Sequence, residues 1–170
     1  MADDPEVSLR AITDEDEEFL CQVYGSTRAD ELALTDWDDA QKEAFVRQQF
    51  EAQRRHYGES YQGATFQIVL VEGQPAGRLY LAHSPDETRI VDLALLPDFR
   101  GLGVGSKLLG DVLADAGSRG AFVTIHVERN NPALRLYSRL GFALAQDRGV
   151  YLFLRWPPPE PAPASPAGAA

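Results

Sequence analysis

A short run of glycines in the middle of the chain has the residue types of an anion-binding loop. The three glycines are Gly101, Gly103 and Gly105. They follow an aliphatic segment, residues 90–96, that reads as a buried strand ended by Pro97, and a helical pattern of apolar residues begins after Ser106. Free amides and the positive end of a helix dipole would point at a ligand in such a loop. Arg100 adds a positive charge at the entrance, so the sequence predicts a ligand that carries phosphate.

Two common phosphate loops do not fit these residues. The Walker loop needs a glycine, then lysine, then serine or threonine, but Ser106 precedes Lys107 here. The dinucleotide fingerprint G-x-G-x-x-G needs its last glycine one residue after Gly105. A plain tight turn with no ligand stays open as the alternative.

A second stretch with defined spacing begins at Asn131. Asn131 is a helix-capping residue, and Pro132 suits a first helical position. One helix face collects apolar side chains, and Gly141 ends the pattern. The apolar residues are Ala133, Leu136, Tyr137 and Leu140. The pattern predicts an amphipathic helix downstream of the glycine loop.

Together the two stretches resemble motifs of the GCN5-related N-acetyltransferase (GNAT) superfamily. The order Arg100-x-x-Gly103-x-Gly105 resembles the family's pyrophosphate loop, Q/R-x-x-G-x-G/A. The second stretch resembles the family's second cofactor motif, on the residues Asn131, Ala133, Tyr137, Gly141 and Phe142. The resemblance covers roughly residues 65–156, and residues 7–61 match only in coarse layout. It implies acetyl-CoA as the cofactor and transfer of an acetyl group to a primary amine by direct attack in a ternary complex.

The resemblance also implies a fold and a set of cofactor contacts. The expected fold is α/β of the α+β kind, with a mixed, mostly antiparallel central sheet, helices on both faces, and two parallel strands that splay around the cofactor. The pyrophosphate is expected on Arg100, Gly101, Leu102, Gly103, Val104, Gly105 and Ser106. Asn131 is expected at the pantetheine arm, with Ala133 and Tyr137 beside the cofactor. A main-chain amide near Leu93, Ala94 or Leu95 is expected to stabilise the oxyanion.

Tyr137 is the candidate general acid. The resemblance places it beside the cofactor sulfur, and a phenol of pKa ~10 can protonate a thiolate whose acid has a pKa of ~8.5. The alternative is a packed aromatic residue on an apolar helix face.

Asp92 is the candidate general base. A carboxylate inside an apolar strand is costly unless it is paired or functional. We expect its side chain to share a face with Ile90 and Ala94, and a water to relay the proton because Asp is short. The alternative is an ion pair, with Arg78 or Arg89.

Two residues of a later strand are weaker candidates for the base. His126 lies in the strand predicted at residues 121–127, and Glu128 follows it directly on the same face. His126 titrates near neutrality, although a hydrogen-bonded sheet histidine is the simpler interpretation.

Composition excludes several other classes. The chain has 170 residues, with 16 Lys+Arg against 26 Asp+Glu and a net charge of −10. A nucleic-acid binder would be basic, and no apolar run is long enough to span a membrane. The single Cys21 and three scattered histidines support neither a disulfide nor a metal site. We therefore expect a cytoplasmic protein without a metal.

The remaining elements are predicted from periodicity and turn residues. Thr13 is expected to cap a helix, with residues 25–34 forming a loop or a broken helix and His83 lying in a turn. A second helix is expected at 38–57, strands at 7–12, 65–71 and 77–81, and a hairpin at 143–146 and 150–155. Residues 1–156 would form one acetyltransferase domain, and the Pro/Ala-rich residues 157–170 a disordered tail.

Three functions remain open at this stage. The first is acetylation of a small-molecule or peptide amine, with a homodimer also open. The second is transfer of another acyl group, or transfer to a hydroxyl. The third is a non-catalytic acyl-CoA-binding sensor or interaction module.

Overall fold

A seven-stranded sheet in the order β1-β2-β3-β4-β5-β7-β6 forms the centre of the protein. The computed structural model describes residues 3–158. The strands are β1 (Val7–Ala11), β2 (Thr65–Val71), β3 (Gln74–His83), β4 (Glu87–Leu95), β5 (Phe122–Glu128), β6 (Ala143–Arg148) and β7 (Tyr151–Trp156). Every neighbouring pair is antiparallel except β4 and β5, which are parallel. The expected mixed, mostly antiparallel sheet is confirmed.

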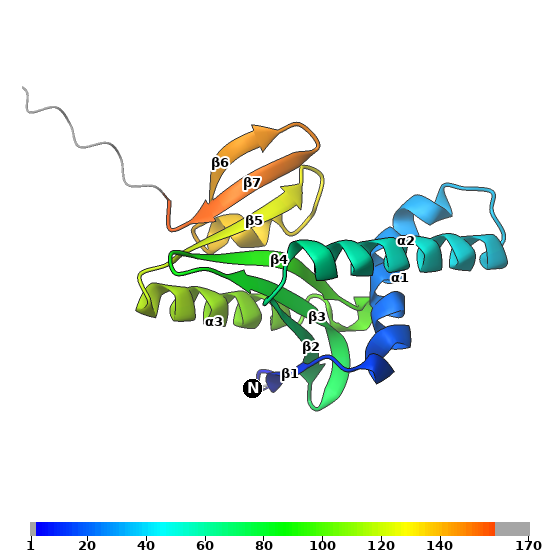
Figure 1. Ribbon diagram of the computed structural model, residues 1–170, viewed down its shortest axis with the longest axis horizontal. Coiled ribbons are helices and arrows are strands. Elements are labelled where there is room, and N and C mark those ends of the chain that lie inside the picture. The colour runs from blue at the N-terminus through cyan, green and yellow to red at the C-terminus, as the bar shows by residue number, and fades with distance from the viewer. Residues whose placement is uncertain (1–2, 159–170) are drawn as a thin grey trace, which may run out of the picture.

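Helices cover both faces of this sheet, as the family resemblance implied (Figure 1). The helices are α1 (Glu17–Ala33), α2 (Asp39–Ser60), α3 (Val104–Ser118) and α4 (Leu134–Arg139), with 3₁₀ turns at η1 (Asp14–Asp16) and η2 (Pro97–Phe99). The larger core forms on the α3 face and includes Leu109 of α3 together with the strand residues Leu79 and Ile90. A smaller core on the other face joins α1 and α2 to β2 through Tyr24, Phe50 and Ile68.

Helix α1 is longer than expected. Residues 25–34, predicted to be a loop or a broken helix, lie almost entirely within α1. The hydroxyls of Ser26 and Thr27 donate back to the carbonyls of Val23 and Tyr24 at 2.7 and 2.6 Å, so these polar residues stay within the helix. The prediction of a loop or a broken helix was therefore wrong, and Gly25 is accommodated within the helix. It lies where α2 packs closely, since a Cβ there would come within 3.2 Å of a Val46 methyl carbon.

Other element boundaries differ by a few residues. The capping pair of Thr13 and Asp16 is present, but it opens η1 before α1 begins. Helix α2 starts at a second capping box, formed by Asp38 and Gln41, and continues three residues past the expected end. His83 is the last residue of β3 and pairs with Thr88, so its assignment to a turn was wrong.

The Pro/Ala-rich tail lies almost wholly outside the described residues, so its expected disorder stays a prediction. Among residues 3–158, no helix has the length and hydropathy needed to cross a membrane.

Candidate active site

The two parallel strands β4 and β5 separate halfway along their length. Their pairing joins Glu87–Ile90 to the strand segment from Phe122 to Ile125 and then stops. Beyond this point β4 continues to Leu95 and β5 to Glu128, with no pairing between them. The expected splayed strands are therefore present. The gap, here called the β4–β5 opening, leaves main-chain polar groups of two strands available to a ligand.

A β-bulge in β4 changes which side chains face the α2 side. Tyr80 pairs with Asp92 and Leu81 pairs with Ile90, so Val91 is an extra residue on β4. The extra residue reverses the alternation of side chains. Asp92 thus lies on the face of Ala94 and Tyr80, whereas Ile90 belongs to the core beneath α3. The expectation that Asp92 and Ile90 share a face was wrong, because periodicity cannot reveal a bulge.

The glycine loop has the backbone that an anion site requires. Gly101 and Gly103 have φ angles of 75° and 83°, in the left-handed region that favours glycine. A Cβ at either position would meet no atom within 4 Å. Helix α3 begins directly afterwards at Val104, so its first amides face the loop without partners within the helix. Open space beside free amides suits a ligand that carries phosphate.

Arg100 stands at the entrance of the loop. Its Nε donates to the carbonyl oxygen of Leu95 at 2.9 Å, and one Nη lies 3.4 Å from the Ser26 hydroxyl. The first bond fixes the guanidinium at the end of β4. The side chain is exposed, so its remaining donors are available to a phosphate group.

The second motif forms a shorter helix than predicted. Asn131 and Pro132 lie in a turn, and α4 begins at Leu134. The side-chain oxygen of Asn131 accepts a hydrogen bond from the Ala133 amide at 2.8 Å. This turn orients α4. The Asn131 side-chain NH₂ group has no hydrogen-bond partner among the described residues and is available to a ligand.

Tyr137 is buried on α4. Its exposure is 5%, and its ring packs edge-on against Phe142 with 5.5 Å between ring centroids. The hydroxyl makes no hydrogen bond to any other residue in the range 3–158. Burial, and then the negative charge of Asp92, raise the pKa of Tyr137 to about 12. A phenol in this setting keeps its proton at neutral pH and can act as an acid.

Asp92 takes part in the ion pair that the sequence left open. Its Oδ2 accepts from Arg78 at 2.8 Å and from the Tyr57 hydroxyl at 3.0 Å. Arg89 pairs with Glu87 instead. The other oxygen, Oδ1, has no hydrogen-bond partner within the described part of the chain. An ion pair holds the carboxylate in place, while Oδ1 can still receive a proton from an amine.

Tyr57 was not among the predicted site residues. It comes from the last turns of α2, where Phe50, Gln53 and Tyr57 follow helical spacing and share one face. Gln53 accepts from Arg78 at 2.9 Å, so this face of α2 contacts the Arg78–Asp92 pair at two points. Burial, and then the charge of Asp92, raise the pKa of Tyr57, which therefore acts as a hydrogen-bond donor.

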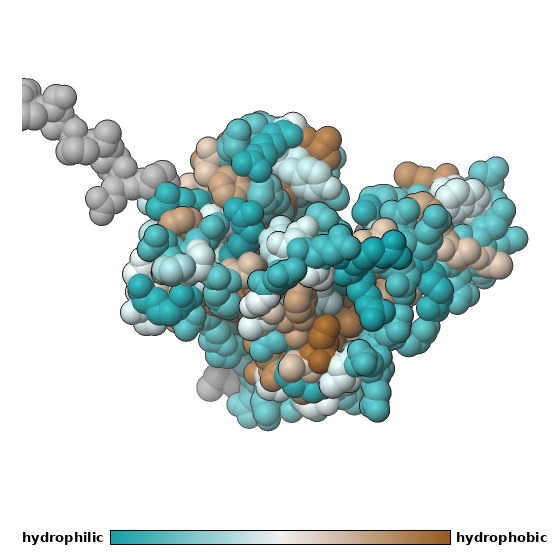
Figure 2. Space-filling model, viewed as in Figure 1, coloured by the Kyte–Doolittle hydropathy of each residue, from teal (hydrophilic) through white to brown (hydrophobic). Residues whose placement is uncertain are grey.

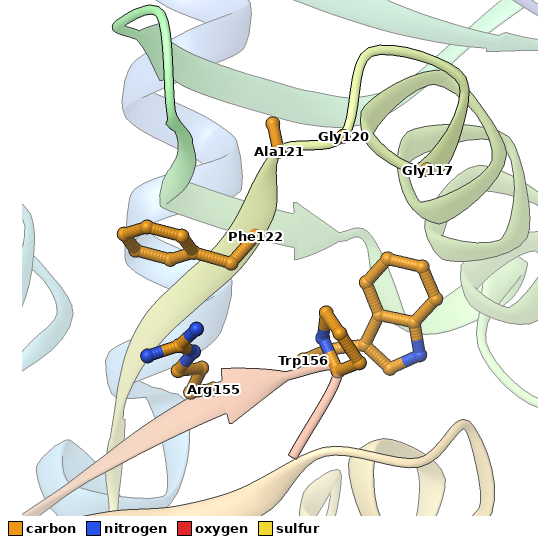
Figure 3. A pocket seen from close by; sticks show the side chains of 7 residues that line it. Gly117, Gly120, Ala121, Phe122, Arg155 and Trp156 are labelled. Carbon is orange, nitrogen blue, oxygen red and sulfur yellow. The ribbon is translucent and has the colours of Figure 1, made fainter. Parts of the chain in front are cut away.

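A cavity of about 220 Å³ lies beside these residues, between α2 and the sheet. Its polar groups come from Gln53, Arg54, Tyr57, Arg78 and Tyr80. The apolar lining is provided by Ile12, Leu20, Phe50 and Phe66. Hydrophobic side chains gather over β2 and β3 below α2 (Figure 2). A second pocket, of about 240 Å³, is lined by Gly117, Phe122 and Trp156 at the far end of α3, about 22 Å of helix away from the glycine loop (Figure 3).

The weaker candidates for the base occupy the other strand of the opening. His126 Nε2 lies 2.6 Å from Arg148 Nη1, as expected for a hydrogen-bonded sheet histidine. Burial, and then the charges of Arg148 and Arg89, lower the pKa of His126. Glu128 is exposed at the end of β5. No three His, Cys, Asp or Glu residues within 3–158 are grouped so that they could hold a metal ion.

Comparison with known proteins places this geometry in context. Over 88% of its length the chain resembles the PaiA N-acetyltransferase of Thermoplasma acidophilum, solved in complex with coenzyme A, with a TM-score of 0.66, 17% identity and 98% of that chain covered. A GCN5-related N-acetyltransferase structure from Rhodopseudomonas palustris gives a TM-score of 0.61 at 22% identity, covering 87% of this chain and 93% of that one.

A match by sequence is shorter. An uncharacterized protein of Mycobacterium leprae is 38% identical over 68 residues, which are 39% of this chain and 19% of that protein. The chain therefore aligns with about one fifth of this relative's length.

The sequence profile described as the acetyltransferase (GNAT) family matches residues 28–142, a range that includes the glycine loop, Asp92 and Tyr137. This range is well over half of the chain, and the solved structures share its fold. The chain belongs to the acetyltransferase (GNAT) family.

Proposed function

We propose that the protein transfers an acetyl group from acetyl-CoA to a primary amine by direct attack within a ternary complex. The observation that carries this proposal is the end of β4–β5 pairing at Ile90 and Ile125, where β4 leads into the glycine loop and its Asp92 is near enough to Tyr137 for the charge to raise the pKa of Tyr137. Free amides of the loop and of α3, together with Arg100, would hold the pyrophosphate. Asn131 and Ala133 would contact the pantetheine arm.

Acetyl-CoA supplies the acetyl group as a thioester. The chain's own contribution begins with orientation, because an amine and a thioester held in contact react far faster than in free solution. The acceptor reaches the β4–β5 opening from the α2 side, since α3 and the larger core cover the other face. Asp92 is on that open side and would attract a protonated amine.

Two proton transfers complete the proposed reaction. A protonated amine first loses one proton to bulk water, and the neutral nitrogen then forms a bond to the acetyl carbon as the carbon–sulfur bond breaks. The amine gives up one proton to Asp92 Oδ1, directly or through a water, and the departing sulfur receives one from the Tyr137 hydroxyl. An amide of β4 near Leu93, Ala94 or Leu95 would stabilise negative charge on the carbonyl oxygen.

A panel of acceptors tests the proposal. The protein is mixed with acetyl-CoA and single amines, free thiol is followed in time, and each acceptor is weighed by mass spectrometry. We expect thiol release that depends on the amine, with one acetyl group gained by the acceptor. Matched amino and hydroxyl compounds distinguish N- from O-transfer, and longer acyl-CoA donors test the acyl group. Tight coenzyme A binding without any modified acceptor would instead favour a sensor.

A further inference from the structure

A cluster of cationic and aromatic side chains covers the half of the sheet beyond the β4–β5 opening. We call Arg89, His126, Arg148 and Phe153 the cationic platform. The Phe153 ring centroid lies 5.0 Å from the guanidinium carbon of Arg148 and 5.7 Å from that of Arg89. The His126 ring is 4.8 Å from the same centroid. The four side chains therefore form one contiguous surface.

Strand register puts this platform on the face that the acceptor must approach. In the strand register, Arg89 lies opposite Thr124 and His126 lies opposite Phe153. Thr124 and His126 are two residues apart on β5, so all of these side chains share one face of the sheet. It is also the face of Asp92, because Arg89 and Asp92 both lie opposite the α3 core. Helices α1 and α2 lie over the other half of the sheet and leave β5, β7 and β6 uncovered (Figure 1). Asp92 and His126 thus flank the β4–β5 opening on the open side.

Arg148 has no ion-pair partner in the part of the chain that the structure describes. Its Nε donates to Gln146 Oε1 at 2.9 Å and its Nη1 faces His126 Nε2 at 2.6 Å. The pKa of His126 is lowered, so the neutral imidazole accepts this bond. No carboxylate among residues 3–158 pairs with Arg148, whereas Arg89 has Glu87. One guanidinium nitrogen of Arg148, Nη2, has no hydrogen-bond partner among the described residues.

Arg155 extends the positive charge along β7. It pairs with Thr124 on the same face, and its guanidinium carbon lies 4.4 Å from the centre of the Phe122 ring. Figure 3 shows these two side chains side by side on neighbouring strands, pointing away from α3. Its Nε is buried without a hydrogen-bond partner in the described chain. The nearby charges of opposite sign on this face are Glu87, which pairs with Arg89, and Glu128 at the outer end of β5. The surplus of arginine stands out in a chain with a net charge of −10.

We infer that the cationic platform binds an anionic group of the acceptor, so that the substrate is an amine that also carries a carboxylate or a phosphate. The inference rests on the proposed N-acetyltransferase function. A guanidinium presents paired donors that match both kinds of anion. The amine would lie near Asp92 and the anion near Arg148, so the two ends of the acceptor meet charges of opposite sign.

Matched pairs of acceptors test this inference. Each pair has the same amine with and without the anion: an ω-amino acid and its carboxamide, and ethanolamine phosphate and ethanolamine. With the wild-type protein we expect kcat/KM for the charged member to exceed that of the neutral one by about 10- to 100-fold. The pair with the larger ratio identifies carboxylate or phosphate as the preferred anion.

The variant Arg148→Gln should remove the preference and leave acetylation of the neutral amines nearly unchanged. Arg129→Gln is the control, because Arg129 pairs with Asp147, which alternates to the other face of β6. Equal rates for both members with the wild-type protein, or a preference that survives in Arg148→Gln, would overturn the inference and leave the proposed function standing. If no amine is acetylated, the proposed function fails. In that case the same pairs are titrated into protein saturated with coenzyme A, and the dissociation constants are compared. Tighter binding of the charged member supports the inference, and equal binding overturns it.

Discussion

The hydroxyl of Tyr57 donates a 3.0 Å hydrogen bond to Oδ2 of Asp92, which joins the end of α2 to the strand beside the candidate site. The same oxygen accepts from Arg78, a residue that is 2% exposed. A buried guanidinium needs its carboxylate partner, since an unpaired buried charge is costly. The contact therefore both fixes α2 on the sheet and fixes the carboxylate.

Tyr57→Phe should lower the free energy of unfolding by about 1.5–3 kcal/mol, the range for a hydrogen bond to a charged group. Urea denaturation followed by circular dichroism measures it. Tyr61→Phe is the control, because the Tyr61 ring packs against Tyr57 but its hydroxyl has no partner within residues 3–158. The control should stay within about 0.5 kcal/mol of wild type. Equal losses in both variants would mean that ring packing, and not the bond to Asp92, fixes α2.

Tyr137→Phe should lower turnover by about 10²–10⁴-fold and leave coenzyme A affinity nearly unchanged, because the change removes the proton donor and keeps the ring. Since the pKa of Tyr137 is raised to about 12, the wild-type rate should show no loss of this acid up to about pH 10. Thiol release and calorimetry measure the two quantities.

Tyr24→Phe is the matched control for that experiment. Tyr24 is also buried, but its hydroxyl contacts Arg28 on α1 and lies in the smaller core. Its turnover should remain near wild type. Full turnover of Tyr137→Phe would make Tyr137 a packing residue only.

Gly77→Ala should destabilise the fold by several kcal/mol. A Cβ at this position would lie 2.1 Å from the carbonyl oxygen of Ala94 and 2.9 Å from the Leu95 Cα, and both are backbone atoms of β4. In contrast, Gly110→Ala in the interior of α3 meets nothing within 4 Å and should stabilise by about 0.5–1 kcal/mol. If β3 and β4 approach this closely, thermal unfolding should give a lower melting temperature than wild type for Gly77→Ala and a higher one for Gly110→Ala.

The Arg10–Asp16 ion pair predicts a dependence of stability on acid pH. The Arg10 hydrogen bonds lower the pKa of Asp16 to about 2, against about 3.9 in an unfolded chain. A lowered pKa gives stability that is present above about pH 4 and lost as pH falls from about 4 to about 2. Asp16→Asn should therefore melt below wild type at pH 7 and converge with it near pH 2. If the difference in melting temperature between Asp16→Asn and wild type stayed constant from pH 7 to pH 2, the charge of Asp16 would play no part in stability.

Local patterns were enough to predict much of the fold and the cofactor side of the candidate site. The alternating glycines and Arg100 predicted an anion-binding loop, and two of these glycines have positive φ. The apolar run before Pro97 predicted a strand, whose parallel partner was implied by the family resemblance. Both features depend on residues adjacent in sequence.

The acceptor side depends on contacts between distant segments. The bulge at Val91 arises from pairing with β3, so the alternation of β4 alone misassigned Ile90. Tyr57 meets Asp92 across 35 residues of sequence, and Arg148 meets His126 across 22. Only the arrangement of α2 and the β6–β7 hairpin around the opening brings these groups together.

The path of the acetyl carbon itself tests the account most directly. Acetyl-CoA labelled with carbon-13 at the carbonyl is mixed with the protein and an amine acceptor, and the label is followed by NMR. We expect the thioester signal to be replaced by a single amide signal on the acceptor, with the same amount of free coenzyme A and no labelled protein. A label that stays in the thioester, appears as free acetate, or collects on the protein would contradict direct transfer to an amine.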